Sequence, residues 1–176
     1  EVWIDPQCPA CSAFHQAMAV TIGELVDDGA LTVHYRPATF LDDAVADQNI
    51  AAGAPRSSRR AVAAWGCAID LGRGSEYLDA LMNSQPATEG MGFDDARLDE
   101  LARSSGITGE DLDRFSGCRT SGRYLAWADA AQRTFAGSKV PGTPTVVLDG
   151  RELPTAVAAD PAALRAAVLE AASGSR

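Results

Sequence analysis

Two cysteines near the start of the chain have the spacing of a redox pair. In the run Cys8-Pro9-Ala10-Cys11, two residues separate them at the expected start of a helix. Unpaired backbone N–H groups and the helix dipole stabilise a thiolate at that end of a helix, which lowers a cysteine pKa from about 8.5 toward roughly 3.5 to 7.5. Pro9 suits the first turn because its missing N–H would have no helical partner there. We therefore expect Cys8 to be the reactive sulfur, with Cys11 one turn inward as its disulfide partner.

Two other interpretations of this close pair stay open. The pair is also half of a zinc site, but zinc requires a second pair, or a Cys and a His, at ligand spacing. His15 is near, whereas His34, Cys67 and Cys118 are far away in sequence. A purely structural disulfide is the other interpretation, although such a short loop would restrict the unfolded chain little. His15 follows Cys11 by four residues on the same helix, and we expect it to be an exposed surface side chain.

The elements on either side of the cysteine pair must position it. Residues 1–5 are typical of a strand that leads into the pair. The helix that begins around Cys8 has apolar residues at helical spacing and ends near Gly29. Residues 30–36 alternate apolar and polar side chains, with β-branched and aromatic content, and predict a second strand. The first part of the chain therefore predicts a β-α-β unit.

From about residue 41 to residue 136 the strand signal is absent, and Gly, Pro and Ser separate a series of predicted helices. We expect these helices from Ser57 or Ser58, either of which can cap the first turn, to Gly72, from Glu76 to Met82, from about Asp94 to Gly106, from about Thr108 onward, and from Thr120 to Phe135. Such an all-helical insertion of roughly 95 residues is far longer than an ordinary loop.

The strand pattern returns at residues 144–148. The turn Asp149-Gly150 and a short strand near residues 152–153 complete a predicted hairpin. A last helix begins at Asp160, with Pro161 at its first position. The predicted order is thus β-α-β, a helical insertion, then β-β-α.

Composition bounds the class of protein. The chain has 176 residues, of which 46% are hydrophobic, enough for one domain with a sizeable insertion. Its net charge of -9 argues against nucleic-acid binding, because binding to the phosphate backbone depends on clustered Lys and Arg. No apolar run approaches the roughly 20 residues of a membrane span. We expect a monomer.

Two motifs carry a resemblance to a known family. They are the run Trp3-Ile4-Asp5-Pro6-Gln7-Cys8-Pro9-Ala10-Cys11 and the later run Gly142-Thr143-Pro144-Thr145. Together with the order of elements, they resemble the DsbA-like branch of the thioredoxin superfamily. This resemblance implies an α/β chain with a thioredoxin fold in residues 1–40 and 137–176, and a large inserted helical domain in residues 41–136.

The resemblance also implies roles for Thr143 and Pro144. In the family, the proline at the position of Pro144 is cis and faces the active-site disulfide. A cis X-Pro bond costs only about 0.5 to 1 kcal/mol and exposes the backbone of the preceding residue to an extended substrate. Thr143 and Pro144 would therefore bind substrate beside Cys8. Without the resemblance, a trans proline that opens a strand would be the simpler expectation.

The chain departs from the family pattern at a residue that assists proton transfer. Many relatives carry a buried acidic residue six positions before the first active-site cysteine, and here that position is Val2. Glu1 should point to the opposite face of the strand. Asp5 is the nearest alternative carboxylate for proton transfer at Cys11, and water is another. Pro9 and Ala10, between the cysteines, also lack the His found in strongly oxidising members.

A second, distant pair of cysteines lies in the predicted insertion. We expect Cys67 late in one helix and Cys118 in the break before the helix that starts near Thr120. If bonded, they close a loop of about 50 residues, which contributes roughly 4 kcal/mol in the chain-entropy model. The alternative is two buried free thiols. The resemblance implies a structural disulfide, because some DsbA-like proteins carry one in the helical domain.

The expected function is that of a protein thiol-disulfide oxidoreductase that introduces disulfides into unfolded or reduced exported proteins. The resemblance implies no bound cofactor and re-oxidation by a membrane partner of the DsbB or vitamin K epoxide reductase type. A distant structural disulfide implies an oxidising, extracytoplasmic location: periplasm, cell envelope or secreted. A signal peptide or membrane anchor would precede Glu1. A disulfide reductase or isomerase, or a non-catalytic metal- or peptide-binding module, is the alternative.

Overall fold

The computed structural model describes residues 1–88 and 90–174. Residue 89 of the predicted insertion and residues 175–176 of the predicted C-terminal part therefore lie outside the described residues. The strands are β1 (Val2–Ile4), β2 (Tyr35–Pro37), β3 (Thr145–Leu148) and β4 (Arg151–Glu152). The helices are α1 (Pro9–Asp27), α2 (Leu41–Ala44), α3 (Ala46–Ala51), α4 (Ser57–Asp70), α5 (Gly74–Asn83), α6 (Asp95–Ser104), α7 (Glu110–Thr120), α8 (Leu125–Gly137), α9 (Thr155–Ala158) and α10 (Pro161–Gly174).

The sheet places the short strand before the cysteine pair in its interior. Its order in the described residues is β2-β1-β3-β4, with β1 parallel to β2 and antiparallel to β3. All three residues of β1 are buried, as expected of a strand covered on both faces. The predicted hairpin joins β3 to β4 through Asp149 and Gly150, which both have positive φ, as a type I′ turn requires.

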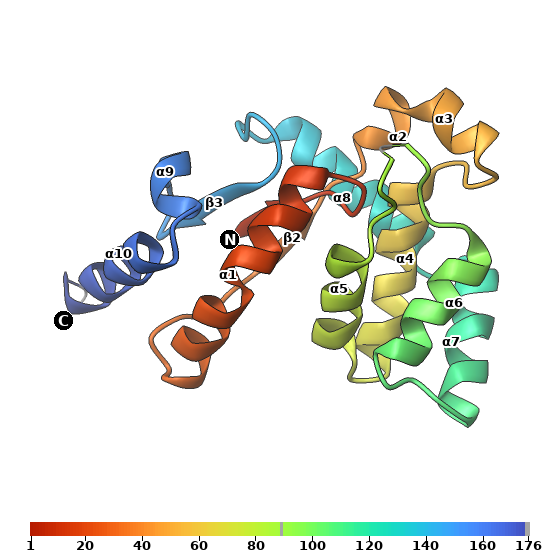
Figure 1. The fold of residues 1–176 in the computed structure, drawn as a ribbon, viewed down its shortest axis with the longest axis horizontal. Coiled ribbons are helices and arrows are strands. Elements are labelled where there is room, and N and C mark those ends of the chain that lie inside the picture. The colour runs from red at the N-terminus through yellow and green to blue at the C-terminus, as the bar shows by residue number, and fades with distance from the viewer. Residues whose placement is uncertain (89, 175–176) are drawn as a thin grey trace.

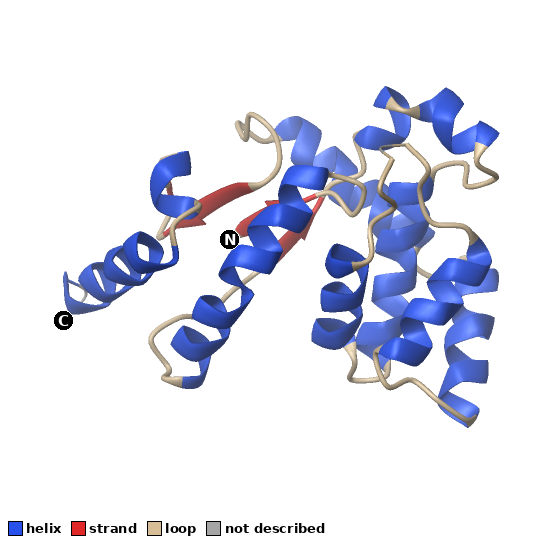
Figure 2. Cartoon of the chain, in the orientation of Figure 1, coloured by secondary structure: helices blue, strands red, loops and turns tan. Residues whose placement is uncertain are grey.

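The strands and helices α3 to α7 occupy different ends of the molecule, whereas α8 reaches back to contact β2 (Figure 1). The strands lie beside α1, α9 and α10, whereas α3 to α7 gather at the opposite end (Figure 2). Helix α1 lies between these two groups and contacts both α10 and α5. Cys8 and Cys11 at the N-terminus of α1 therefore lie where the two parts of the chain meet. The division at residues 40/41 and 136/137 into separate domains stays a prediction.

Helix α4 is the centre of the helical block. It contacts α5, α7 and α8, and nearly all of its side chains from Ser57 to Ala68 are buried. Close packing leaves no room for a side chain at Gly66, because a β-carbon there would lie 2.5 Å from the ring of Tyr124. This position therefore requires glycine for a reason that helix propensity alone would not reveal.

Several predicted boundaries differ from the structure. The second strand, expected over residues 30–36, pairs only from Tyr35 to Pro37, because its partner β1 provides three residues for the ladder. The helix expected from Thr120 begins at Leu125, since Gly122 with φ +69° interrupts it. As a result, Cys118 lies in the last turn of α7 rather than in a break between helices.

The described helices were also compared with the requirements of a membrane span. None of them combines the length and the apolar character needed to cross a bilayer.

Candidate active site

The N-terminus of α1 holds Cys8 and Cys11 as two free, buried cysteines. Cys8 is the N-cap residue and Pro9 begins the helix, as predicted. A tight turn precedes the helix, in which the Cys8 N–H donates to the carbonyl oxygen of Asp5 at 3.0 Å. The N–H groups of Cys11 and Ser12 donate to the carbonyl oxygen of Cys8 at 3.0 and 3.2 Å. Cys8 therefore lies at the N-terminal end of α1, and Cys11 lies in the first turn of the helix.

The two cysteines have opposite proton affinities. A hydrogen bond from the Cys11 thiol, together with the backbone N–H groups of Cys11 and Ala10, lowers the pKa of Cys8 to about 6, although burial opposes the shift. Burial raises the pKa of Cys11 far above its ordinary value, and the neighbouring Cys8 sulfur raises it further. At neutral pH, Cys8 is therefore mainly a thiolate while Cys11 keeps its proton.

The second sequence motif lies against these sulfurs. The Thr143–Pro144 peptide bond is cis. As a thiol, Cys8 donates to the carbonyl oxygen of Thr143 at 3.4 Å, across 135 residues of sequence. The buried Thr143 hydroxyl has no regular hydrogen-bond partner in the described structure, yet it is close enough to lower the pKa of both Cys8 and Cys11. The structure thus brings together Cys8, Cys11, Thr143 and Pro144.

The helical part of the chain holds the turn that carries Cys8. The side-chain amide of Gln85, which follows α5, donates to the carbonyl oxygens of Pro6 and Cys8 at 2.7 and 3.0 Å. A second bond joins α1 to α5, because the Ser12 hydroxyl donates to the carbonyl oxygen of Met82 at 2.6 Å. This role of Gln85 was not predicted from the sequence, because a lone Gln 77 residues away from Cys8 carries no local signal of the contact.

Asp5 is fully buried beside Cys11. Its carboxylate accepts hydrogen bonds from the Ser58 hydroxyl at 2.5 Å, the Gln7 N–H at 2.9 Å and the Leu41 N–H at 3.2 Å. Burial raises the pKa of Asp5 to about 7, and these three donors oppose the shift. The backbone of Asp5 lies close enough to the Cys11 sulfur to lower the pKa of Cys11, against the larger effect of burial. Val2, at the position of the family's acidic residue, is buried in the apolar core.

A polar cluster extends from Asp5 into the helical block. The Gln7 side-chain amide donates to the Ser58 hydroxyl at 2.9 Å and to Asn49 Oδ1 at 3.1 Å, and Asn49 donates back to Gln7 Oε1 at 2.8 Å. Asp42 accepts from the Gln7 amide at 3.3 Å and from the Ser58 N–H at 2.8 Å. From the sequence, Ser58 was predicted only as a candidate helix cap, and Gln7 was named only as part of the first motif. The contacts of Asp42 and Asn49 were not predicted.

The expectation that His15 is a surface side chain is wrong. His15 is 5% exposed, and its Nε2 lies 2.8 Å from Asp79 Oδ1. The reason is that α5 packs against α1 and covers this face of the helix. Helical spacing alone cannot show which face a neighbouring helix will cover.

An apolar groove begins at the candidate active site. It has a volume of about 610 Å³ and runs between the exposed side of α1 and the segment around the cis-proline. Small side chains line the α1 side, at Ala10, Ala13 and Ala17. Pro141 and Leu153 are among the residues of the opposite wall. The groove is open to solvent and leads directly to Ala10, between the two cysteines.

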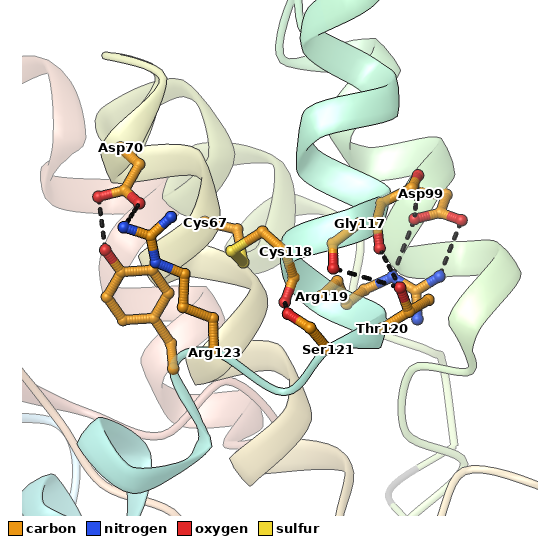
Figure 3. The surroundings of a disulfide bond; sticks show 11 residues. Cys67, Asp70, Asp99, Gly117, Cys118, Arg119, Thr120, Ser121 and Arg123 are labelled. Atoms are coloured by element: carbon orange, nitrogen blue, oxygen red, sulfur yellow. Dashed lines mark hydrogen bonds and ion pairs between the residues drawn. A yellow bond between two sulfur atoms is a disulfide. The ribbon is translucent and has the colours of Figure 1, made fainter.

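The distant cysteines form a disulfide, Cys67–Cys118, which joins α4 to α7 (Figure 3). Cys67 is buried and Cys118 is partly buried. Ion pairs flank the bond on both sides: Asp70 with Arg123, and Asp99 with Arg119. The bond lies within the helical block, between α4 and α7.

Histidine and acidic side chains do not gather around the close cysteine pair. Among residues 1–88 and 90–174 there is no group of three or more His, Cys, Asp or Glu side chains arranged to hold a metal ion. The opposite proton affinities of Cys8 and Cys11, beside a cis-proline, support thiol–disulfide exchange.

Comparison with known sequences points in the same direction. The family model described as thioredoxin matches residues 1–168. The serine/threonine-protein kinase PknE of Mycobacterium tuberculosis is 31% identical over 153 residues, which are 83% of this chain and 26% of that protein. The chain thus spans about a quarter of the length of the curated relatives that it matches.

Solved structures extend the likeness to nearly the whole chain. The reduced disulfide bond oxidoreductase DsbG of Mycobacterium tuberculosis is 32% identical, with a TM-score of 0.75 over 96% of this chain and 75% of that one. Oxidised DsbA of the same organism is 31% identical, with a TM-score of 0.75 over 97% and 81%. MdbA of Actinomyces oris, a thiol-disulfide oxidoreductase, shares the fold with a TM-score of 0.77 at 19% identity over 96% and 77%. The chain therefore belongs to the thioredoxin family and is similar in sequence and fold to thiol-disulfide oxidoreductases of the DsbA and DsbG type.

Proposed function

We propose that this oxidoreductase introduces disulfides into reduced exported proteins through Cys8 and Cys11. A substrate thiolate attacks the Cys8 sulfur of the Cys8–Cys11 disulfide, and Cys11 leaves as a thiolate that takes up a proton. A second substrate thiolate then attacks the substrate sulfur of the mixed disulfide, and Cys8 leaves as a thiolate. The substrate loses two electrons and gains a disulfide, while the enzyme becomes the dithiol.

The opposite proton affinities of the two cysteines carry this proposal. The pKa of Cys8 is lowered to about 6, so its thiolate is stable at neutral pH and is a good leaving group. Groups that stabilise the reduced form of a dithiol make its disulfide a stronger oxidant. The direction of the Cys8 pKa shift therefore supports an oxidase rather than a reductase.

The apolar groove and the cis-proline segment provide a site for the substrate. An extended peptide would pair with the backbone of Thr143 and lay apolar side chains along Ala10, Ala13 and Ala17 of α1. This position brings a substrate sulfur to Cys8, whose thiol already contacts the Thr143 carbonyl oxygen. Such binding depends mainly on backbone contacts and apolar area, so it suits unfolded clients of varied sequence.

Asp5 is the proton partner that we propose for Cys11. The backbone of Asp5 lies close enough to Cys11 to lower the pKa of its thiol, and one bridging water molecule would connect the Asp5 carboxyl group to the Cys11 sulfur. A pKa of about 7 allows this carboxyl group to release and accept protons near neutral pH. Asp5 would thus replace the acidic residue that relatives carry at the position of Val2.

The proposed setting is extracytoplasmic, in the periplasm or cell envelope or as a secreted protein. The Cys67–Cys118 disulfide supports an oxidising compartment. Re-oxidation of Cys8 and Cys11 would come from a membrane partner of the DsbB or vitamin K epoxide reductase type.

The equilibrium of the Cys8–Cys11 pair with a glutathione redox series tests this function. Mass spectrometry after alkylation of free thiols distinguishes the close pair from Cys67 and Cys118. We expect a potential near about -120 mV, at the oxidising end of the thioredoxin-fold scale. A potential near about -270 mV would make the protein a reductase, and a pair that never exchanges with glutathione would reject a redox function altogether.

A further inference from the structure

Ser58 connects the helical block to the buried carboxylate beside Cys11. It is 0% exposed and lies in the first turn of α4. Its hydroxyl donates to Asp5 Oδ1 at 2.5 Å and accepts from the side-chain amide of Gln7 at 2.9 Å. The Ser58 hydroxyl therefore donates to one residue of the active-site turn and accepts from another, rather than bonding its own helix.

Helix capping does not explain the orientation of Ser58. Ser58 is the second residue of α4, after the N-cap residue Arg56 and Ser57, and no side chain caps the helix from the N-cap position. Helix α4 instead receives its cap from Asp42 of α2. The Asp42 carboxylate accepts from the N–H groups of Ser58 and Arg59 at 2.8 and 2.9 Å. Because Asp42 satisfies these helix donors, the Ser58 hydroxyl is available to Asp5.

The Ser58 hydroxyl is the closest hydrogen-bond donor to the Asp5 carboxylate. From α2, the Asp42 carboxylate faces Asp5 and raises its pKa. From α4, Arg59 directs its guanidinium group to Asp129, at 2.5 and 2.8 Å, and so does not pair with Asp5. From α1, Cys11 lies near the backbone of Asp5, which lowers the pKa of the Cys11 thiol. A hydrogen bond to the charged form of an acid favours that form, and Ser58 is the largest of the groups that oppose protonation here.

We propose that Ser58 is a positioning residue for the redox reaction: its hydroxyl keeps Asp5 able to accept the Cys11 proton. This inference rests on the proposed function, and it makes the helical insertion a part of the proton-transfer machinery. The step concerned is the reverse of the substrate attack in the proposed cycle: Cys11 attacks the Cys8 sulfur of a mixed disulfide with substrate. The Cys11 proton passes to the Asp5 carboxylate, the Cys8–Cys11 disulfide forms, and the substrate leaves as a thiolate.

Ser58→Ala removes the hydroxyl and Ser57→Ala is its matched control. Ser57 is equally buried and precedes Ser58 in the same turn, but its hydroxyl accepts from the Phe93 N–H at 2.6 Å and not from the active-site turn. Both variants lose one buried hydroxyl, so a purely structural effect should appear in both. Ser58→Thr retains a hydroxyl and should restore the wild-type behaviour.

Two measurements carry the test. The first is the titration of the Asp5 carboxyl group in the reduced protein by carbon-13 NMR with labelled aspartate, assigned with Asp5→Asn. The second is the pH profile of mixed-disulfide resolution, followed by rapid mixing of the reduced protein with a disulfide peptide.

In Ser58→Ala we expect the midpoints of the Asp5 titration and of the resolution profile to move up together by roughly one pH unit, because a hydrogen bond to a charged group is lost. Resolution at pH 7 should slow by roughly fivefold. Ser57→Ala should leave both midpoints in place.

The outcomes separate this inference from the proposed function. If the Asp5 titration moves in Ser58→Ala but the resolution profile does not, Asp5 is not the proton partner and the inference fails while redox exchange stands. Equal shifts in Ser57→Ala and Ser58→Ala would also overturn it. If Ser58→Ala does not fold, the wild-type protein still tests whether Asp5 accepts the Cys11 proton. Its resolution midpoint must coincide with its Asp5 titration, and a mismatch would overturn the inference. A chain with no disulfide exchange at all would instead reject the proposed function.

Discussion

Cys8 and Cys11 are separated by two residues and are both free, whereas Cys67 and Cys118 are separated by 51 positions and are bonded to each other. The first pair lies at the end of a helix, against backbone N–H groups and the Thr143 hydroxyl. The second pair lies inside the helical block, between α4 and α7. The same side chain thus occurs in two different electrostatic settings.

This difference shows that the surroundings, and not the cysteine itself, separate a reactive pair from a structural one. Thiol–disulfide exchange needs a thiolate and a good leaving group, and around Cys8 the neighbouring donors provide both. A bond that closes a long loop instead stabilises the fold by restricting the unfolded chain. Variants of each pair should therefore affect different properties of the protein.

The largest effect should come from Cys8→Ser, which should reduce disulfide exchange with a peptide substrate to background. Cys11→Ser, mixed with a disulfide peptide, should still form the mixed disulfide through Cys8 but should retain it, because the sulfur of Cys11 that would displace the peptide is missing. Mass spectrometry of the trapped complexes checks both variants. Retention of exchange in Cys8→Ser would show that the roles of the two pairs have been assigned the wrong way round.

Replacing both members of the other pair, in Cys67→Ser with Cys118→Ser, should mainly affect stability. We expect the free energy of unfolding to fall by about 4 kcal/mol, the loop-closure term for a loop of this length. The redox potential of the Cys8–Cys11 pair should remain the same. Denaturant unfolding and glutathione equilibration measure the two quantities, and a change in the potential would mean that the distant pair also takes part in the chemistry.

Cys11→Ala should raise the pKa of Cys8 from about 6 toward its ordinary value, because the hydrogen bond from Cys11 is the largest cause of the lowering. A folded-state pKa below the unfolded value stabilises the reduced protein at high pH, and this stability is lost as pH falls through about 6. In Cys11→Ala the folded-state pKa lies closer to the unfolded one, so this contribution to stability should be smaller and its loss should be complete at a higher pH. Thiolate absorbance and alkylation rate, each measured against pH, test this, with Cys11→Ser as the control that keeps a hydroxyl donor.

The smallest effect should come from Thr143→Val, which keeps the shape of the side chain but removes its hydroxyl. Because that hydroxyl lowers the pKa of Cys8, we expect the pKa to rise by roughly one unit or less. Thr145→Val is the matched control, since the Thr145 hydroxyl bonds the carbonyl oxygen of Gly142 at 2.9 Å instead. Equal shifts in the two variants would mean that the local backbone, not the Thr143 hydroxyl, tunes Cys8.

The sequence was sufficient where the signal is local. The periodicity of α1, Pro9 in its first turn and the turn Asp149-Gly150 each depend on neighbouring residues, and each corresponds to an element of the structure. The succession of elements and the close cysteine pair with its later threonine–proline motif led to the thioredoxin family, which the comparisons confirm. Boundaries such as the start of α8 were less accurate, because a single glycine with positive φ decided them.

Only the tertiary structure decided which side chains surround the cysteines. The contact of Gln85 with the Cys8 carbonyl spans 77 residues, that of Ser58 with Asp5 spans 53, and that of His15 with Asp79 spans 64. None of these residues belongs to a local pattern that would reveal its partner. Burial by a packed neighbour, rather than residue type, raised the pKa of Asp5 and covered His15. The sequence by itself therefore determined the elements and the reactive sulfurs, whereas the packing of distant helices against α1 determined their proton chemistry.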